Sequence, residues 1–379
     1  MGLIQPFQVM EVMERAVQLE AAGRHIVHLE IGQPDFGAPA AVRAAAASAI
    51  RTDALGYGPT LGLPALRAAL SGHYQNRYGV ALPPERIAIT AGASGALLLA
   101  LGTLVNPGDE VLMPDPCYAC NANFVHLYGG VPVYMPVGAG QAFQPGLADI
   151  KAAWTARSRG VVLASPANPT GTLIDRAEFT SIAAWVHDRG GFVIMDEIYQ
   201  ELVYGQDPWT ALSACPDTWV VNSFSKYFGM TGWRLGWMVA PQAGVRNVEK
   251  LAQNLFICPS TPAQRAAVAA FQPDSLAEVE GRRLEFMRRR DLLVPALRRL
   301  GFGIPREPGG AFYVYADCSA TGLPSDELAT RLLEEAGVAV TPGGDFGRHL
   351  AGSHIRFAYT RPVSELEEAI GRIARMLLR

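Results

Sequence analysis

Residues 219–226 read WVVNSFSK, an apolar run followed by two serines and a lysine. The run 219–222 has the length and character of a buried strand, and the polar residues follow where that strand ends. Five other apolar runs have the same form: 86–90, 110–113, 160–164, 192–195 and 235–240. They alternate with helical patterns such as 94–105 and 176–189, which is typical of a mostly parallel sheet flanked by helices. The sequence therefore predicts an α/β fold.

The two ends of the chain have a different pattern. A long Arg-rich amphipathic helix is expected over 276–300 and a strand over 311–316. Helices are also expected over 9–22, 326–336 and 365–378. Ser325 is the expected N-cap of the second of these three, and Ser364 with Glu367 predicts a capping box for the third.

These segments predict a smaller α+β domain built from both chain ends. We expect it to comprise residues 1–45 and 272–379, and the large domain to comprise residues 46–271. A chain of 379 residues suits one large and one smaller domain.

Bulk composition excludes several classes of protein. Hydrophobic residues make up 49% of the chain and the formal net charge is −3, with no basic run that would favour nucleic acid. No apolar stretch reaches the roughly 18 residues of a membrane span. Residues 1–7 lack the features of a secretory signal, and the five cysteines are odd in number. We therefore expect a cytoplasmic protein without a nucleic-acid or membrane partner.

The residues that follow the strands are unusual as a group. Ligands of open parallel sheets bind at the carboxyl ends of the strands. Five of the expected strands are followed by Ala93 and Ser94, by Tyr118, by Asn168, by Asp196 with Tyr199, and by Ser223, Ser225 and Lys226. A helix N-terminus, an aromatic ring, an amide, a carboxylate, a phenol and an amine should therefore converge on one rim.

This set of groups matches what pyridoxal 5'-phosphate requires. A lysine amine forms a Schiff base with the cofactor aldehyde. A carboxylate keeps the pyridine nitrogen protonated, so that the ring withdraws electrons from the substrate. Hydroxyls, amides at a helix N-terminus and an arginine hold a phosphate.

Six segments strengthen this interpretation: HLEIGQPDF (28–36), YGPTLGLPALR (57–67), SPANPTG (165–171), DEIY (196–199), SFSKYFGMTGWRLG (223–236) and HIRFAY (354–359). With them the chain resembles, over nearly its whole length, the class I and II aminotransferases. These are fold-type I pyridoxal-phosphate enzymes of the aspartate aminotransferase superfamily. The resemblance implies a large domain with a mostly parallel seven-stranded sheet.

The resemblance also implies roles for individual residues. Lys226 would be the Schiff-base lysine and proton carrier, Asp196 would pair with the pyridine nitrogen, and Tyr199 with Asn168 would contact the ring oxygen. Tyr118 would stack on the ring. The phosphate would be held by Ala93, Ser94, Ser223, Ser225 and Arg234.

The substrate and the subunit arrangement follow in the same way. Arg356, with the backbone N–H of Gly32 and Asn168 nearby, would bind the substrate α-carboxylate. Tyr57 would reach the phosphate from a neighbouring subunit, which implies a homodimer with shared active sites.

Two features depart from the family's pattern. Ala93 occupies a phosphate-loop position that often carries a small polar residue, so only its backbone serves there. No second arginine for a side-chain carboxylate is evident, which argues against an aspartate-specific enzyme. Four apolar residues expected near the mouth of the site favour an uncharged substrate side chain: Ile31, Phe36, Phe312 and Phe346.

The predicted function is therefore ping-pong transfer of an amino group from an L-amino acid to a 2-oxo acid. The first alternative is a pyridoxal-phosphate lyase of the same fold, such as a C–S β-lyase or an enzyme like aminocyclopropane-carboxylate synthase. The second is a cofactor-binding regulator, but such regulators carry a DNA-binding domain ahead of a pattern that here begins within about ten residues.

Several residues have ordinary structural interpretations. Cys117 and Cys120 have C-x-x-C spacing without a second ligand pair, so we expect packing and no metal site. Glu30 and Glu197 are expected to be structural. Tyr313, which follows Gly309 and Gly310, is expected to be an ordinary strand aromatic, and a place at the mouth of the pocket is the alternative. Residues 223–226 also satisfy S-x-x-K, but the partner motifs of the serine acyl-enzymes are missing from the sequence.

Overall fold

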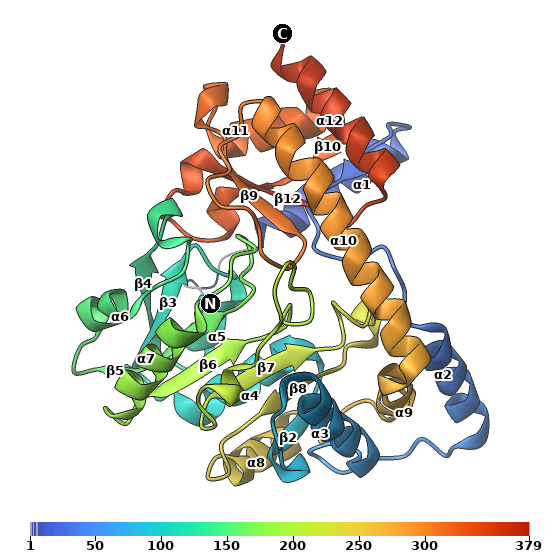
Figure 1. The fold of residues 1–379 in the computed structure, drawn as a ribbon, viewed down its shortest axis with the longest axis vertical. Coiled ribbons are helices and arrows are strands. Elements are labelled where there is room, and N and C mark those ends of the chain that lie inside the picture. Colours follow the sequence, from blue (N-terminus) through green and yellow to red (C-terminus); the bar gives the residue numbers. More distant parts are fainter. Residues whose placement is uncertain (1, 3, 5–6, 379) are drawn as a thin grey trace.

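The computed structural model describes residues 2, 4 and 7–378, and in these a seven-stranded sheet forms the centre of the molecule (Figure 1). In spatial order its strands are β2 (Ile87–Thr90), β8 (Gly236–Val239), β7 (Trp219–Ser223), β6 (Phe192–Asp196), β5 (Ser158–Ala164), β3 (Glu110–Asp115) and β4 (Val131–Pro136). The pairings from β7 to β4 are parallel, whereas β8 is antiparallel to both of its neighbours. The predicted α/β class is confirmed.

All six predicted strands lie in this sheet. They read as continuous apolar runs because both faces of the sheet are covered, and every residue of β6 and β7 is buried. The seventh strand, β4, was not located from the sequence. It lies at the edge, is half exposed, and contains Pro132 and Pro136, which an edge strand tolerates.

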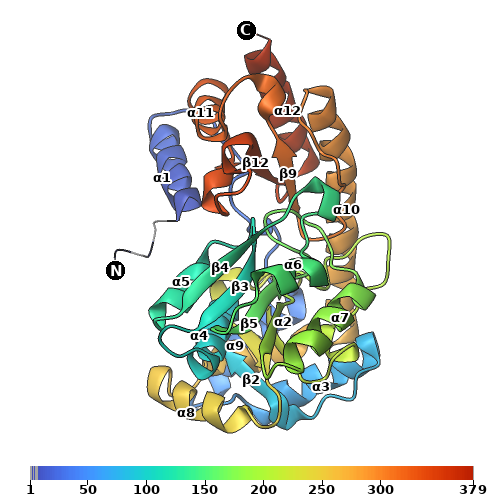
Figure 2. The ribbon, with the colours of Figure 1, turned by 90° about the vertical axis from the view of Figure 1, so that its left-hand side faces the viewer.

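Helices cover the two faces of the sheet (Figure 2). On one face, α4 (Gly92–Leu104), α5 (Cys120–Leu127) and α8 (Val245–Leu255) share a core with alternate strand residues such as Ile194. The opposite core includes Met195 and residues of α3 (Pro64–Tyr78), α6 (Leu147–Ala153), α7 (Arg176–His187) and α9 (Thr261–Ala267). Helix α2 (Ala40–Thr52) packs on α9. The sheet is thus a buried layer, apart from its half-exposed edge strand β4.

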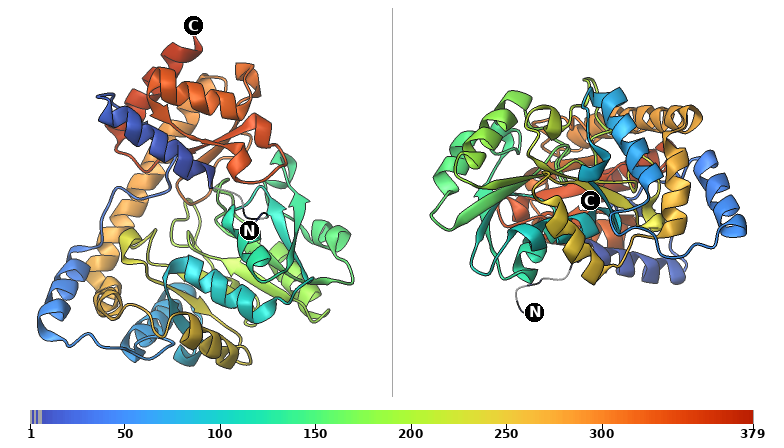
Figure 3. Two further views of the ribbon diagram at one scale, coloured as in Figure 1. Left: turned by 180° about the vertical axis from the view of Figure 1, so that it is seen from behind. Right: turned by 90° about the horizontal axis from the view of Figure 1, so that it is seen from below.

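The chain ends form a smaller α+β unit beside the carboxyl ends of the central strands (Figures 1 and 3). Its antiparallel sheet has the order β11 (Thr341–Pro342), β12 (His354–Ala358), β9 (Tyr313–Asp317), and β1 (Val27–His28) pairs in parallel with β10 (Val338–Ala339). Its helices are α1 (Gln8–Ala21), α11 (Ser325–Arg331), α12 (Val363–Leu377) and the long α10 (Pro273–Arg299), which reaches down to the large sheet. The exact domain boundaries stay a prediction.

Three local predictions at this end were wrong. Ser325 is not an N-cap, because the preceding Pro324 takes that position and the Ser325 hydroxyl donates to Ala351 O instead. The predicted capping box also fails, since α12 begins at Val363 after Pro362 and so places Ser364 and Glu367 inside the helix. Proline fixes an extended entry into both helices and has no side-chain oxygen for capping.

The third error concerns the strand expected over 311–316. Strand β9 begins only at Tyr313, because Ala311 has a φ of 57°, in the left-handed region that interrupts a strand. Across the described part of the chain, no helix combines the length and apolar character needed to cross a membrane.

Candidate active site

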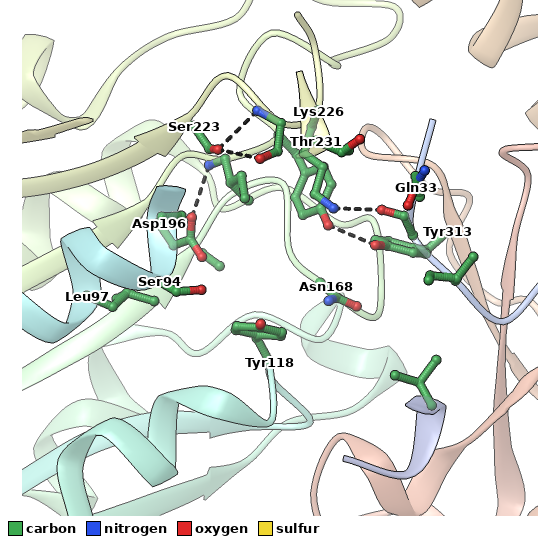
Figure 4. A pocket seen from close by; sticks show the side chains of 18 of the residues that line it. Gln33, Ser94, Leu97, Tyr118, Asn168, Asp196, Ser223, Lys226, Thr231 and Tyr313 are labelled. Carbon is green, nitrogen blue, oxygen red and sulfur yellow. Dashed lines mark hydrogen bonds between the residues drawn. The ribbon is translucent and has the colours of Figure 1, made fainter. Parts of the chain in front are cut away.

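A cavity of about 370 Å³ opens where the central strands end and the small antiparallel sheet begins. Figure 4 shows Tyr118, Asn168, Asp196 and Lys226 around it. Of the residues predicted to form the site, those that line the cavity are Gly32, Ala93, Ser94, Tyr118, Asn168, Asp196, Tyr199, Ser223, Ser225, Lys226, Arg234 and Arg356. Tyr57 does not line it and is 84% exposed. The structure therefore brings together every predicted site residue except the one expected to act in a neighbouring subunit.

Lys226 follows β7 and lies in the cavity with its amine against the N-terminal segment. Its Nζ donates a hydrogen bond to Gly32 O at 2.6 Å. Burial lowers the pKa of Lys226 to about 8, the charges of Arg356 and Arg234 lower it as well, and Asp196 opposes them. About a tenth of this lysine is therefore the neutral, nucleophilic amine at pH 7, far more than for an ordinary lysine.

Asp196 ends β6 and is buried, with 6% of its surface exposed. Its Oδ1 accepts a hydrogen bond from Ile198 N at 3.0 Å. Burial raises the pKa of Asp196 to about 6, against that hydrogen bond and the charge of Lys226. Because burial makes the ionised carboxylate unfavourable, Asp196 favours a cationic partner such as a protonated ring nitrogen.

The N-terminus of α4 forms an anion-binding corner with the loop after β7. Ala93 and Ser94 begin the helix, and the Ser223 hydroxyl donates to Ser225 Oγ at 2.9 Å. Gly92 has a φ of 71°, and a Cβ there would lie 2.7 Å from a terminal nitrogen of Arg234. Backbone N–H groups, two hydroxyls and a guanidinium thus gather at one helix terminus, which suits a phosphate.

Arg356 lies on β12 with only 3% of its surface exposed. Its guanidinium donates to Asn168 Oδ1 at 2.8 Å, to Thr341 Oγ1 at 3.2 Å and to Glu30 O. Its Nε has no partner, and no carboxylate forms an ion pair with it among the residues that the structure describes. The charge of Asp345 acts on Arg356 without a direct contact. A buried guanidinium that no carboxylate contacts is costly, so a ligand carboxylate is the natural partner.

Tyr313 lies on β9, as expected, and it also lines the cavity, which was the alternative that the sequence left open. Its hydroxyl lies 2.8 Å from the Tyr199 hydroxyl, and its ring centroid lies 4.3 Å from the Arg356 guanidinium carbon. A Cβ on Gly32 would lie 1.7 Å from the Tyr313 hydroxyl, so position 32 requires glycine. The only sequence signal was its place just after Gly309 and Gly310.

The apolar wall of the cavity was also predicted incorrectly. Of the four residues proposed, only Ile31 lines the cavity. Phe36 packs edge-on against Phe286, while Phe312 and Phe346 are buried behind Tyr199 and Arg356. The apolar residues that do line this side include Phe7, Val9 and Met10 at the start of α1. Packing between segments that are distant in sequence places these residues at the cavity. The periodicity of hydrophobic residues in a sequence does not reveal such packing.

Four residues that the sequence assigned to ordinary structural positions do not line this cavity: Glu30, Cys117, Cys120 and Glu197. Cys117 and Cys120 are free thiols, and no cluster of metal-ligating side chains occurs within residues 2, 4 and 7–378. Glu197 accepts hydrogen bonds from Thr210 and the backbone of Ala211. Glu30 accepts one from the His28 ring at 2.7 Å.

Comparisons with known proteins agree with this geometry. The family model for aminotransferase class I and II matches residues 24–373. Valine–pyruvate aminotransferase of Mycobacterium tuberculosis (strain ATCC 25618 / H37Rv) is 43% identical over 378 residues, which cover 99% of this chain and 97% of that protein. A crystal structure of an aminotransferase from Mycobacterium tuberculosis superposes with a TM-score of 0.95 at 42% identity, covering 99% and 97% of the two chains. Aspartate aminotransferase from Thermus thermophilus with maleate has a TM-score of 0.93 at 34% identity, covering 98% and 97%.

Proposed function

The chain belongs to the class I and II aminotransferases. We propose that it transfers an amino group from an L-amino acid with an uncharged side chain to a 2-oxo acid in a ping-pong cycle. The observation that carries the proposal is one cavity that holds both Lys226, with a pKa of about 8, and Arg356, a buried guanidinium without a carboxylate partner. Relatives that match nearly the whole chain are named aminotransferases, which favours transamination over the lyase alternative.

The residues around the cavity fit pyridoxal 5'-phosphate. Asp196 would bind the ring nitrogen, Tyr199 and Asn168 the ring oxygen, and Lys226 the aldehyde carbon. Tyr118 would cover one face of the ring. The phosphate would be held by Ala93, Ser94, Ser223, Ser225 and Arg234. When bound, this cofactor supplies a sink for the electron pair that deprotonation leaves on the substrate Cα.

The protein's own groups position the substrate and move its proton. Arg356 binds the α-carboxylate, and Asn168, already hydrogen bonded to it, fixes the guanidinium plane. The carboxylate so held brings Cα toward Lys226. Its Nζ then removes the Cα proton from the amino donor and returns a proton to Cα when the 2-oxo acid is aminated. Such general acid–base catalysis contributes roughly 10²- to 10⁴-fold.

The donor side chain would lie against the apolar wall of Phe7, Val9, Met10 and Ile31. The cationic residues that line the cavity, Lys226, Arg234 and Arg356, all have other proposed roles. No cation from this chain's cavity lining is therefore left for a side-chain carboxylate. The similarity to an enzyme named valine–pyruvate aminotransferase supports an aliphatic donor and a short 2-oxo acid acceptor.

The experiment is a spectral titration of the purified protein with pyridoxal phosphate, followed by a panel of L-amino acids without acceptor. Valine, leucine and alanine should convert the visible absorbance band to a band in the near ultraviolet. Pyruvate should restore the visible band, and aspartate should react poorly. Accumulation of pyruvate and ammonia without any acceptor would instead establish a lyase.

We further propose a cytoplasmic homodimer in which Tyr57 serves the phosphate site of the neighbouring subunit. This tyrosine is 84% exposed and stands outside the cavity of its own chain. Aromatic side chains such as tyrosine are enriched in protein–protein interfaces relative to the rest of the surface, which supports this position for Tyr57.

A further inference from the structure

Tyr313 contacts three parts of the proposed active site at once (Figure 4). Its hydroxyl lies 2.8 Å from the Tyr199 hydroxyl, its ring lies under the Arg356 guanidinium, and it fills the space beside Gly32. It is 98% buried, with only 2% of its surface exposed. It comes from β9 of the small sheet, whereas Tyr199 follows β6 of the central sheet.

The two hydroxyls share one hydrogen bond, so the direction of that bond matters. Each phenol has one proton to donate and two sites that accept. Burial raises the pKa of both phenols. The Arg356 guanidinium lies 4.3 Å from the centroid of the Tyr313 ring, and its charge makes the Tyr313 hydroxyl more acidic. The more acidic phenol is the better donor. Tyr313 therefore donates and Tyr199 accepts.

This direction leaves the Tyr199 proton free for another acceptor. A hydroxyl that accepts a hydrogen bond becomes a stronger donor, by about 10–30% per bond. We propose that Tyr313 is a positioning residue that directs the Tyr199 proton toward the ring oxygen of the cofactor. The proposal rests on the proposed function, because that oxygen belongs to the cofactor the function requires.

The contact with Arg356 gives this arrangement a second consequence. The guanidinium lies over the face of the Tyr313 ring at 4.3 Å, where its charge makes the hydroxyl a better donor. A substrate carboxylate on Arg356 neutralises that charge. Binding at the carboxylate site is thereby coupled to the strength of the hydrogen bond on the ring oxygen, over a chain of three side chains.

The chain offers a closely matched control in Tyr315. It lies two residues along the same strand and is 5% exposed, and its hydroxyl has no partner among the described residues. Tyr313→Phe and Tyr315→Phe each remove one buried hydroxyl from β9 and keep the ring. Only the first removes a hydrogen bond to Tyr199.

The test is a pH titration of the visible absorbance band of the cofactor-loaded protein, which needs no turnover. Weaker donation to the ring oxygen favours its protonated form, so Tyr313→Phe should raise the midpoint of the transition by about half a pH unit. Tyr315→Phe should titrate as the wild type does. Tyr199→Phe should raise the midpoint further, and adding Tyr313→Phe to it should produce no additional shift.

Two results would overturn the inference alone: an unchanged midpoint in Tyr313→Phe, or a shift that persists when Tyr199 is already phenylalanine. A wild-type protein without a visible band would overturn the proposed function, and this inference with it. Thermal unfolding of each variant separates these results from a loss of folding.

Discussion

The amine of Lys226 donates a hydrogen bond to the backbone carbonyl of Gly32 at 2.6 Å, across 194 positions of sequence. This bond joins the loop after the central strand β7 to the N-terminal segment that borders the substrate side of the cavity. The partner is a neutral oxygen and not a carboxylate, so the surroundings do little to keep the amine charged.

The first prediction concerns covalent capture of the cofactor. Lys226→Ala should abolish the adduct that borohydride fixes on the protein, because the amine that forms it is gone. The other lysines, Lys151 and Lys250, are exposed, and Lys250→Ala provides the control. Mass spectrometry of the reduced protein measures the adduct. A wild-type yield in Lys226→Ala would show that another group holds the cofactor.

The pH dependence of that capture follows from the lowered pKa of Lys226. Only the neutral amine attacks, so the initial rate of capture by the cofactor-free protein should rise through pH 8 and level off above pH 9. An ordinary lysine, with a pKa near 10.4, would still gain rate at pH 10. Stopped-flow absorbance at a series of pH values distinguishes the two profiles.

Arg356→Lys should impair substrate binding although the charge is kept. The fork that donates to Asn168 and would bind the carboxylate is lost, and a charge-assisted hydrogen bond contributes about 1.5–3 kcal/mol. We expect kcat/KM for L-valine to fall roughly 10- to 100-fold. Amines that lack a carboxylate, such as isobutylamine, should lose nothing, and an equal loss for both would contradict the role.

Asp196→Asn should stabilise the cofactor-free protein although it weakens cofactor binding. The folded-state pKa of Asp196 is raised to about 6 from an unfolded value of 3.8. The folded protein is therefore more stable when Asp196 is protonated. That stability is lost as the pH rises from 3.8 through 6. A rise of about two units corresponds to about 3 kcal/mol. The cofactor-free variant should therefore melt at a higher temperature than wild type at pH 7 and show no difference at pH 4.

The same substitution should weaken cofactor binding, because the ring nitrogen loses its anionic partner. Asp207→Asn, at an exposed position, is the matched control for both measurements. If Asp196→Asn leaves the melting temperature at pH 7 unchanged, Asp196 is not a strained buried charge.

Subunit mixing tests the position of Tyr57. A heterodimer of Lys226→Ala and Tyr57→Ala chains has one intact site if each lysine works with the tyrosine of its partner. Activity should then reappear on mixing two chains that are each impaired alone. If Tyr57 acts within its own chain, no combination restores activity.

The sequence predicted the polar residues of the cavity far better than its apolar wall. Asp196, Ser223 and Lys226 each follow an apolar run that is buried on both faces, and such runs are legible without a structure. Strand β4 was not predicted, because an exposed edge strand with prolines lacks a continuous apolar run. Ser325 and Ser364 were misjudged because a preceding proline started each helix earlier.

Tyr313 and Met10 show why the cavity residues contributed by the small unit were harder to predict. Each reaches the cavity through packing between the small antiparallel sheet, α1 and the central sheet. The neighbours of Met10 in sequence give no signal of that packing, and Tyr313 has only the preceding Gly309 and Gly310 as a signal. Phe346 illustrates the reverse, since an apolar residue close in sequence to the site covers the back of Arg356 instead of facing the substrate.

The start of α1 beside the cavity has a practical consequence for anyone producing the protein. Phe7, Val9 and Met10 line the substrate side, whereas α12 ends at the far tip of the small unit (Figure 1). A purification tag fused ahead of Phe7 would be close in sequence to three residues that line the cavity. Kinetic work therefore calls for a tag after α12, and a fusion ahead of Phe7 becomes a handle for altering which amino acids are admitted.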